Sequence, residues 1–201
     1  DYSMMTSVFT PANAEKFPKT LKVTMSSQDW CGQSFMQLNW RDNQYQTQIR
    51  SYFESEGDEN FAVPYAMLED ELFNRIRINP MALPTGKIKM LPSLVIVRLL
   101  HKDFKVAEVE ANLEDYQGTD FQGNNLKVYR VKYPTLNRTL EIVFENEVPY
   151  KIPGWKDSYP GFDGQIRTTI AKRTETIKSP YWQKNALEDS AMRKKLGVEG
   201  L

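Results

Sequence analysis

The sequence holds one thiol and one imidazole, the two groups that a cysteine nucleophile and its base would require. Cys31 lies in the turn-like segment Asp29–Gly32, and His101 follows an apolar run. A cysteine nucleophile needs a neighbouring base, but a single cysteine is more often a packing residue, and we favour that interpretation. One Cys and one His also argue against an ordinary zinc site. We therefore expect no metal, no cofactor and no catalytic residue.

Carboxylates are the second group of side chains that could take part in catalysis. Glu108 and Glu110 lie on one alternating run and Glu141 and Glu145 on another, and a carboxylate pair could carry out glycoside hydrolysis. Alternation also places charged side chains on the solvent face of a strand, so a solvated surface is the favoured interpretation. The segment 115–125 has several oxygen donors, but it lacks the spacing of an EF-hand. We interpret it as a polar loop rather than a calcium site.

A set of large aromatic residues remains as the best candidate for recognition. Most of these rings fall at predicted strand ends and in loops, where rings often line a groove or an interface. Capping the ends of a barrel would use the same rings and is the favoured interpretation of the set as a whole. Binding of a ligand or partner is the alternative, and its candidate residues are Trp30, Arg138, Tyr150, Trp155, Tyr159, Phe162 and Trp182.

The element that must position this set lies within residues 126–155. Apolar and polar residues alternate from Tyr129 to Tyr133 and again from Leu140 to Phe144, and Pro134–Asn137 between them has the composition of a turn. This pattern predicts a long β-hairpin. Because two strands alone do not bury such a face, further strands must cover it.

The segment that follows this hairpin, Gly154–Gly164, is predicted to be a loop. It combines three glycines with Pro160 and several aromatic rings, and glycine and proline are typical of turns rather than of strands. We expect this loop to present its rings at one end of the sheet as the recognition surface.

The remaining elements follow from periodicity. Alternation predicts strands within residues 21–26, 36–40, 45–51, 87–98, 107–114 and 166–170, with a polar loop over 55–60. A helix is predicted from about Tyr65 to Ile78, with Glu69, Asp70 and Glu71 near its positive end, and a last helix after the N-cap Ser179. The expected fold is mainly β: a single antiparallel curved sheet or open barrel, one internal helix and one C-terminal helix, in one domain of residues 1–201.

Composition narrows the class of protein. Twenty-six basic residues balance 26 acidic ones, and hydrophobic residues make up 40% of the chain. This balance argues against a nucleic-acid partner, because such proteins normally carry a basic surplus. The hydrophobic content is sufficient for a globular core, and no apolar run approaches the ~20 residues that span a bilayer.

Several segments also contain short sequence motifs that are specific to one family. These motifs are Thr6–Pro11 (TSVFTP), Asp29–Gly32 (DWCG), Tyr52–Glu54 (YFE) with Glu56–Asp58 (EGD), Leu68–Glu71 (LEDE), Arg138–Ile142 (RTLEI) and Pro149–Trp155 (PYKIPGW). They resemble an uncharacterised bacterial family whose members are often labelled "septum formation inhibitor Maf". The label does not fit, because the Ser-x-Ser-Pro-Arg-Arg loop of true Maf pyrophosphatases is absent from this sequence.

The resemblance implies a lipoprotein of the bacterial cell envelope, in the periplasm or at the outer membrane. It implies a longer precursor whose upstream lipid anchor is the only attachment to the membrane. Two functions then fit the chain. The first is a non-catalytic protein that binds an apolar or amphipathic ligand, or docks onto outer-membrane proteins or lipid. The second is an envelope hydrolase that uses surface carboxylates or Cys31.

Overall fold

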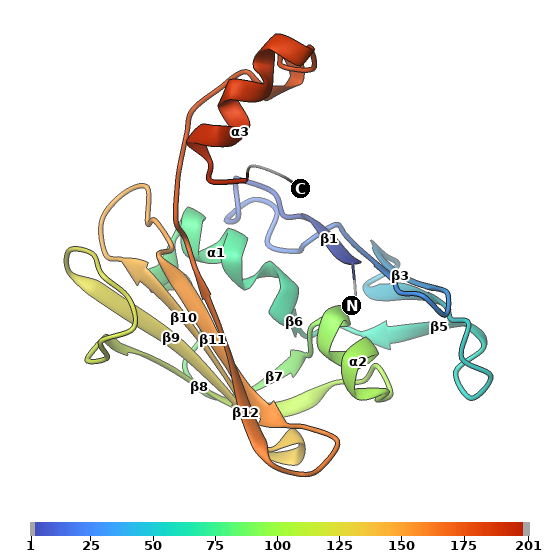
Figure 1. Ribbon diagram of the computed structural model, residues 1–201. Coiled ribbons are helices and arrows are strands. Elements are labelled where there is room, and N and C mark those ends of the chain that lie inside the picture. Colours follow the sequence, from blue (N-terminus) through green and yellow to red (C-terminus); the bar gives the residue numbers. More distant parts are fainter. Residues whose placement is uncertain (1–2, 199–201) are drawn as a thin grey trace.

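Two β-sheets with helices packed between them form the protein in the computed structural model, which describes residues 3–198 (Figure 1). The first sheet contains, in sequence order, β1 (Ser3–Phe9), β2 (Lys22–Gln28), β3 (Gln33–Arg41), β4 (Gln44–Arg50) and β5 (Asp58–Pro64). All of its neighbouring strands are antiparallel. The first sheet is therefore a simple meander.

The second sheet is also arranged in sequence order. Its strands are β6 (Met67–Leu68), β7 (Gly86–Leu91), β8 (Ala107–Asp115), β9 (Leu126–Tyr133), β10 (Arg138–Glu145), β11 (Gly154–Pro160) and β12 (Ile166–Lys172). Only the short β6–β7 pair is parallel within the described residues. The predicted long hairpin is confirmed as β9–β10, in which Leu140 pairs with Val131 and Ile142 with Tyr129.

Three α-helices and five 3₁₀ turns complete the described chain. The helices are α1 (Leu72–Ile78), α2 (Leu94–Leu100) and α3 (Ala191–Lys195). The 3₁₀ turns are Glu69–Glu71, Pro80–Ala82, Pro134–Leu136, Tyr181–Gln183 and Leu187–Ser190. Among the described residues, no helix has the length and hydropathy that crossing a bilayer requires.

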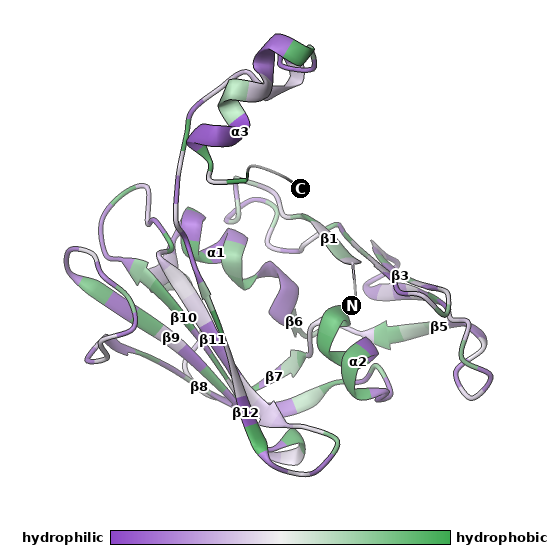
Figure 2. Cartoon of the chain, viewed as in Figure 1, coloured by the Kyte–Doolittle hydropathy of each residue, from purple (hydrophilic) through white to green (hydrophobic). Residues whose placement is uncertain are grey.

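Each internal helix covers one sheet. Leu94 and Val97 of α2 pack into a core with the inward side chains of β2, β3 and β4. Leu72 and Ile76 of α1 pack into a second core against β8, β9 and β10. Figure 2 shows the corresponding alternation of hydrophobic and hydrophilic residues along β9 and β10, and a mainly hydrophobic α2. The helices thus form a shared layer between the sheets.

The mainly β, antiparallel prediction is confirmed, and both sheets are open, with β1 and β5 at the edges of one and β12 and β6 at the edges of the other. The number of sheets differs from the prediction. The break falls after Pro64, where the chain leaves β5 and pairs Met67 and Leu68 with Met90 and Leu91 instead. The predicted helix from Tyr65 is therefore shorter and begins as a 3₁₀ turn at Glu69.

Two further expectations about elements are wrong. The predicted strand over residues 87–98 ends at Leu91, and α2 follows, because Pro92 interrupts the strand and the Ser93 hydroxyl accepts a hydrogen bond from the Val95 amide. Residues 58–60 belong to β5 rather than to a loop. The predicted C-terminal helix is present but shorter: two 3₁₀ turns follow Ser179, and α3 is limited to five residues.

Candidate ligand-binding cleft

A cleft of about 520 Å³ lies where the helical layer meets the edges of both sheets. Its walls come from β1, the Glu69–Glu71 turn, α1, α2 and strands β10 to β12. The apolar part of the lining includes Val8, Phe73, Val95, Ile96, Leu99 and Trp155. The polar part is concentrated in Glu69, Asp70, Arg138 and Asp157. This lining makes the cleft amphipathic.

Strand alternation brings the β10 and β11 side chains into the cleft. Leu140 of β10 pairs with Asp157 of β11, and Ile142 pairs with Trp155. Because successive side chains point to opposite faces, Trp155, Asp157 and Tyr159 share one face of β11, and all three line the cleft. Arg138 begins β10 on the same face as Leu140.

Arg138 is the centre of the polar end and is only 2% exposed. Its Nη1 and Nη2 donate to the two oxygens of Glu69 at 2.6 Å each. Its Nε and Nη2 donate to the two oxygens of Asp157 at 2.7 and 2.9 Å. Burial opposes the charge of the guanidinium, but the two carboxylates outweigh burial and raise the pKa of Arg138 above its ordinary value. Arg138 is therefore a permanent cation held between two acids.

Asp70 is the third carboxylate of the polar end. Its Oδ1 accepts from the Ser93 hydroxyl at 2.8 Å and its Oδ2 from the Leu94 amide at 3.1 Å, so it ties the 3₁₀ turn to α2. Burial raises the pKa of Asp70 to about 7, and the charge of Glu69 acts in the same direction. Burial also raises the pKa of Asp157, against the opposing effect of Arg138. The polar end holds three carboxylates and one guanidinium.

The predicted site residues divide into two groups. Arg138, Trp155 and Tyr159 come together in the cleft, whereas Tyr150 packs against the core of the second sheet. Trp30, Phe162 and Trp182 are 95%, 94% and 65% exposed and lie on three different segments. The structure therefore does not gather the seven predicted residues on one surface.

The expectation that Gly154–Gly164 is a loop is wrong. Residues up to Pro160 form β11, which pairs with both β10 and β12, and only the tight turn beyond Pro160 is irregular. Gly154 is required within this strand, because a Cβ there would lie 2.2 Å from the Phe121 ring and 2.3 Å from a backbone oxygen. Glycine therefore marks a close approach here rather than a turn.

The acidic residues of the cleft were not predicted as site residues. Glu69 and Asp70 were assigned to the helix dipole, and Asp157 to a loop. One signal in the sequence points to the first two: Glu69–Glu71 stands between two apolar residues, Leu68 and Leu72. No such signal exists for Asp157, because residues 156–158 are all polar and do not alternate. Glu71 is fully buried as well, where it receives hydrogen bonds from Arg75 and from the Thr20 hydroxyl.

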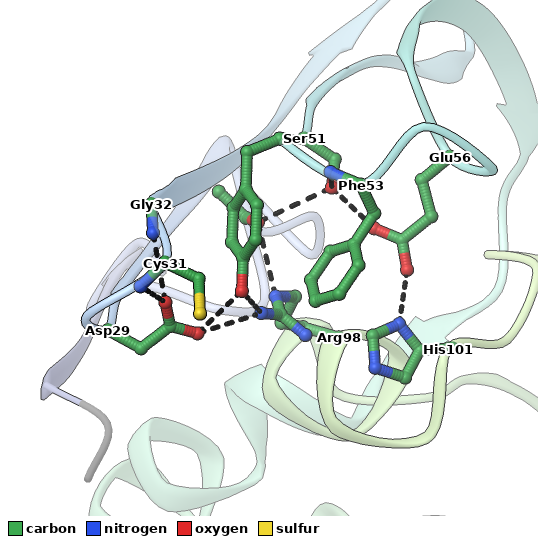
Figure 3. A network of polar contacts seen from close by, with 10 residues as sticks. Asp29, Cys31, Gly32, Ser51, Phe53, Glu56, Arg98 and His101 are labelled. Atoms are coloured by element: carbon green, nitrogen blue, oxygen red, sulfur yellow. Dashed lines mark hydrogen bonds and ion pairs between the residues drawn. The ribbon is translucent and has the colours of Figure 1, made fainter.

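A second polar network connects α2 to the first sheet (Figure 3). Arg98 of α2 is buried, donates to the Ser34 hydroxyl at 3.1 Å and forms an ion pair with Asp29 at 3.5 Å. Its guanidinium carbon also lies 4.4 Å from the centre of the Phe53 ring. A hydrogen bond from Tyr52 lowers the pKa of Asp29. These contacts hold α2, and therefore one wall of the cleft, against the first sheet.

The same network contains Cys31 and His101 but does not join them. His101 Nδ1 lies 2.5 Å from Glu56 Oε1, while the Cys31 amide donates to Asp29 and its side chain is exposed. Figure 3 shows the two residues at opposite ends of the network, with Arg98 between them. The arrangement pairs the imidazole with a carboxylate instead of a thiol.

Several of the other sequence candidates for chemistry lie opposite basic residues or form ion pairs with them. Glu110 stands opposite Lys87 and Lys132 in the sheet, and Glu141 accepts from Arg130. In the segment 115–125, Asp115 pairs with Lys127 and Asp120 with Lys156. Within residues 3–198, no group of three or more His, Cys, Asp and Glu side chains is arranged to hold a metal ion.

Comparisons with protein-family models, with curated proteins and with solved structures found no match to this chain.

Proposed function

We propose that this protein is a non-catalytic binding protein of the bacterial cell envelope, which holds an amphipathic molecule in the cleft. The observation that carries this proposal is the division of the cleft lining into a large apolar part and a compact ionic end. Its volume falls in the range of ~300 to 1,000 Å³ that is typical of small-molecule sites. The envelope location and the upstream lipid anchor are supported by the family resemblance, and docking onto outer-membrane proteins is the other function that this location would allow.

The hydrolase alternative draws less support from the geometry. Cys31 and the acidic faces of β8 and β10 lie outside the cleft. Within the cleft, two of the three carboxylates are bound to Arg138 through both oxygens. A general acid or base needs a proton that it can exchange with substrate, and of the three carboxylates only Asp70 can do so. A glycosidase requires a pair of such carboxyl groups, so this arrangement favours binding over hydrolysis.

The proposal is tested by binding of N-phenyl-1-naphthylamine, an apolar probe that is uncharged at neutral pH and fluoresces when bound. Leu99→Trp should fill the cleft, since Leu99 lines it, and should weaken probe binding by about tenfold or more. Leu100→Trp is the matched control, because Leu100 is the next residue of α2 and is similarly half-buried. It should leave the affinity within about twofold of the wild type.

Circular dichroism would establish that both variants are folded. Unchanged probe affinity in folded Leu99→Trp, or no binding of the probe to the wild type, would overturn the proposal. The envelope location has a separate test: fractionation of the native bacterium should place the protein with the membranes, and recovery in the cytosol would contradict it.

A further inference from the structure

We infer that the cleft selects amphipathic ligands whose polar group is a cation, such as an alkylammonium, and that this group lies beside Asp70. The inference rests on the proposed function and names the class of ligand. It begins from the charges that line the polar end, which are the carboxylates of Glu69, Asp70 and Asp157 against the single guanidinium of Arg138. A bound cation would bring the net charge of the polar end closer to zero, and a bound anion would make it more negative.

Arg138, the obvious anchor for an anionic head group, is already engaged. Its Nε, Nη1 and Nη2 all donate to Glu69 or Asp157, at 2.6 to 2.9 Å. An anionic ligand would have to displace one of these carboxylates, which would then be buried without its partner. Removing one member of a buried ion pair is strongly unfavourable, so the network excludes anions from its own cation.

Asp70 is the carboxylate that a ligand can reach. It lines the cleft and is half-buried, whereas Glu69 and Asp157 are 3% and 7% exposed. Each of its oxygens accepts one hydrogen bond, from Ser93 or Leu94. A carboxylate offers about four acceptor positions, so Asp70 retains capacity for an ammonium donor.

Tyr133 of β9 also borders the polar end but adds no charge to it. Its ring is buried and lies 5.1 Å from the Arg138 guanidinium. Burial and the neighbouring Glu69 raise the pKa of its hydroxyl, so Tyr133 is neutral.

The charged groups that face Asp70 from the packed elements are two carboxylates and one guanidinium, so their sum is negative. The 3₁₀ turn contributes Glu69, β10 contributes Arg138 and β11 contributes Asp157, while Asn74 of α1 and Ser93 of α2 are neutral. The apolar walls reduce the screening of these charges by water. A ligand cation would therefore meet a negative, partly desolvated site with an apolar channel for its chain.

The test is competition against bound N-phenyl-1-naphthylamine with four probes below their micelle concentrations: dodecylamine, dodecanol, dodecanoate and spermidine. Dodecylamine should displace the naphthylamine at a concentration about tenfold lower than dodecanol, and dodecanoate should be weaker than both. Spermidine, a cation without an apolar body, should not compete. Asp70→Asn should reduce dodecylamine to the level of dodecanol, and the control Asp103→Asn, a change at an exposed ion pair, should leave the order unchanged.

Displacement by dodecanol separates the two proposals, because it supports the cleft whatever the order of the charged probes. Dodecylamine no better than dodecanol, or dodecanoate as the best competitor, would overturn the inference alone. A second measurement covers the case in which Asp70→Asn fails to fold. For wild-type protein, the advantage of dodecylamine over dodecanol should grow between about pH 6 and pH 8 as Asp70 ionises, because the amine itself stays protonated over this range. An advantage that is constant over this range would contradict a role for Asp70.

Discussion

The side chain of Arg138 joins two neighbouring strands of the second sheet to the helical layer. It begins β10, it binds Asp157 of β11, and it binds Glu69 at the entry to α1. The sequence made Arg138 a candidate for binding because it lies near aromatic residues, but gave no sign of its two partners. These partners are 69 and 19 residues away along the chain. Pairing over such separations is set by tertiary structure, which local periodicity does not encode.

The first prediction at this scale concerns stability. Arg138→Met should lower the free energy of unfolding by roughly 3 to 5 kcal/mol, because it leaves Glu69 and Asp157 buried without their cation. Arg167→Met is the control, since the Arg167–Asp163 pair is 63% and 44% exposed, and its loss should cost less than about 1 kcal/mol. Urea denaturation of both variants measures the difference. Equal small losses would show that the network contributes little.

The second prediction concerns pH. In the folded protein Asp70 keeps its proton up to a pKa of about 7, whereas its ordinary value is 3.8. The folded state therefore binds the proton more tightly than the unfolded state, and stability should fall as the pH rises from about 4 to about 7, by about 4 kcal/mol over the full range. Asp157, whose pKa is also raised, adds a smaller change of the same sign.

Urea denaturation between about pH 5 and pH 8 measures this dependence. Asp70→Asn should remove most of it, because the amide does not titrate. A wild-type stability that rises over this range would contradict the assignment. The expected loss of stability occurs where Asp70 becomes charged, which is also the condition that favours a cationic ligand.

At the scale of elements, α2 is the part of the fold that the sequence least predicts. Residues 94–100, LVIVRLL, are rich in β-branched residues and favour a strand by propensity. Their burial on two sides decides otherwise: Leu94 and Val97 enter the first core, while Ile96 and Leu99 line the cleft. A helix can present both sets at once, so tertiary packing overrides the local preference.

The cap of α2 provides a test of this account. Ser93→Ala removes the side chain that accepts from Val95 and donates to Asp70, and it should cost about 1 to 2 kcal/mol of stability. Ser190→Ala is the matched control, because Ser190 precedes α3 but makes no side-chain cap hydrogen bond. Thermal unfolding should separate the two variants, and equal midpoints would show that the Ser93 cap is unimportant.

The hairpins, in contrast, were predictable from the sequence. The turn at Asp42 and Asn43 has two residues with positive φ, 52° and 59°, which Asp and Asn tolerate better than most residues. Asn137 closes the β9–β10 connection with φ of 46° in the same way. Local turn chemistry and alternation suffice for such elements. β11 was missed because its glycine and proline mark a close approach and a strand end instead of a loop.

At the scale of the whole molecule, the segment after β12 stands apart from the packed body, as Figure 1 shows. Its large apolar side chains are exposed, with Tyr181 at 76% and Leu187 at 93%. The three core clusters are formed by residues between Val8 and Trp155. The hydrophobic contacts that stabilise the fold are therefore made mostly by residues that precede this segment.

Truncation after Glu175 should accordingly leave the midpoint of thermal unfolding nearly unchanged, within about 2 °C. The cut spares Arg173, whose amide donates to Pro153 beside β11. Differential scanning calorimetry of the full and shortened chains measures this effect, and a large decrease would mean that the segment packs on the body. Probe binding in the cleft should be retained.

The arrangement of the strands also bears on how the protein folds. The strands of both sheets follow the order of the sequence, so strand pairs join neighbours in sequence, which favours fast, local folding. The cleft is different, because it takes Thr6 and Val8 from the first strand and Thr169 from the last. It closes only when nearly the whole chain has been placed. Recovery of probe binding during refolding should therefore coincide with the slowest structural step, so that a ligand distinguishes the finished protein from its partly assembled sheets.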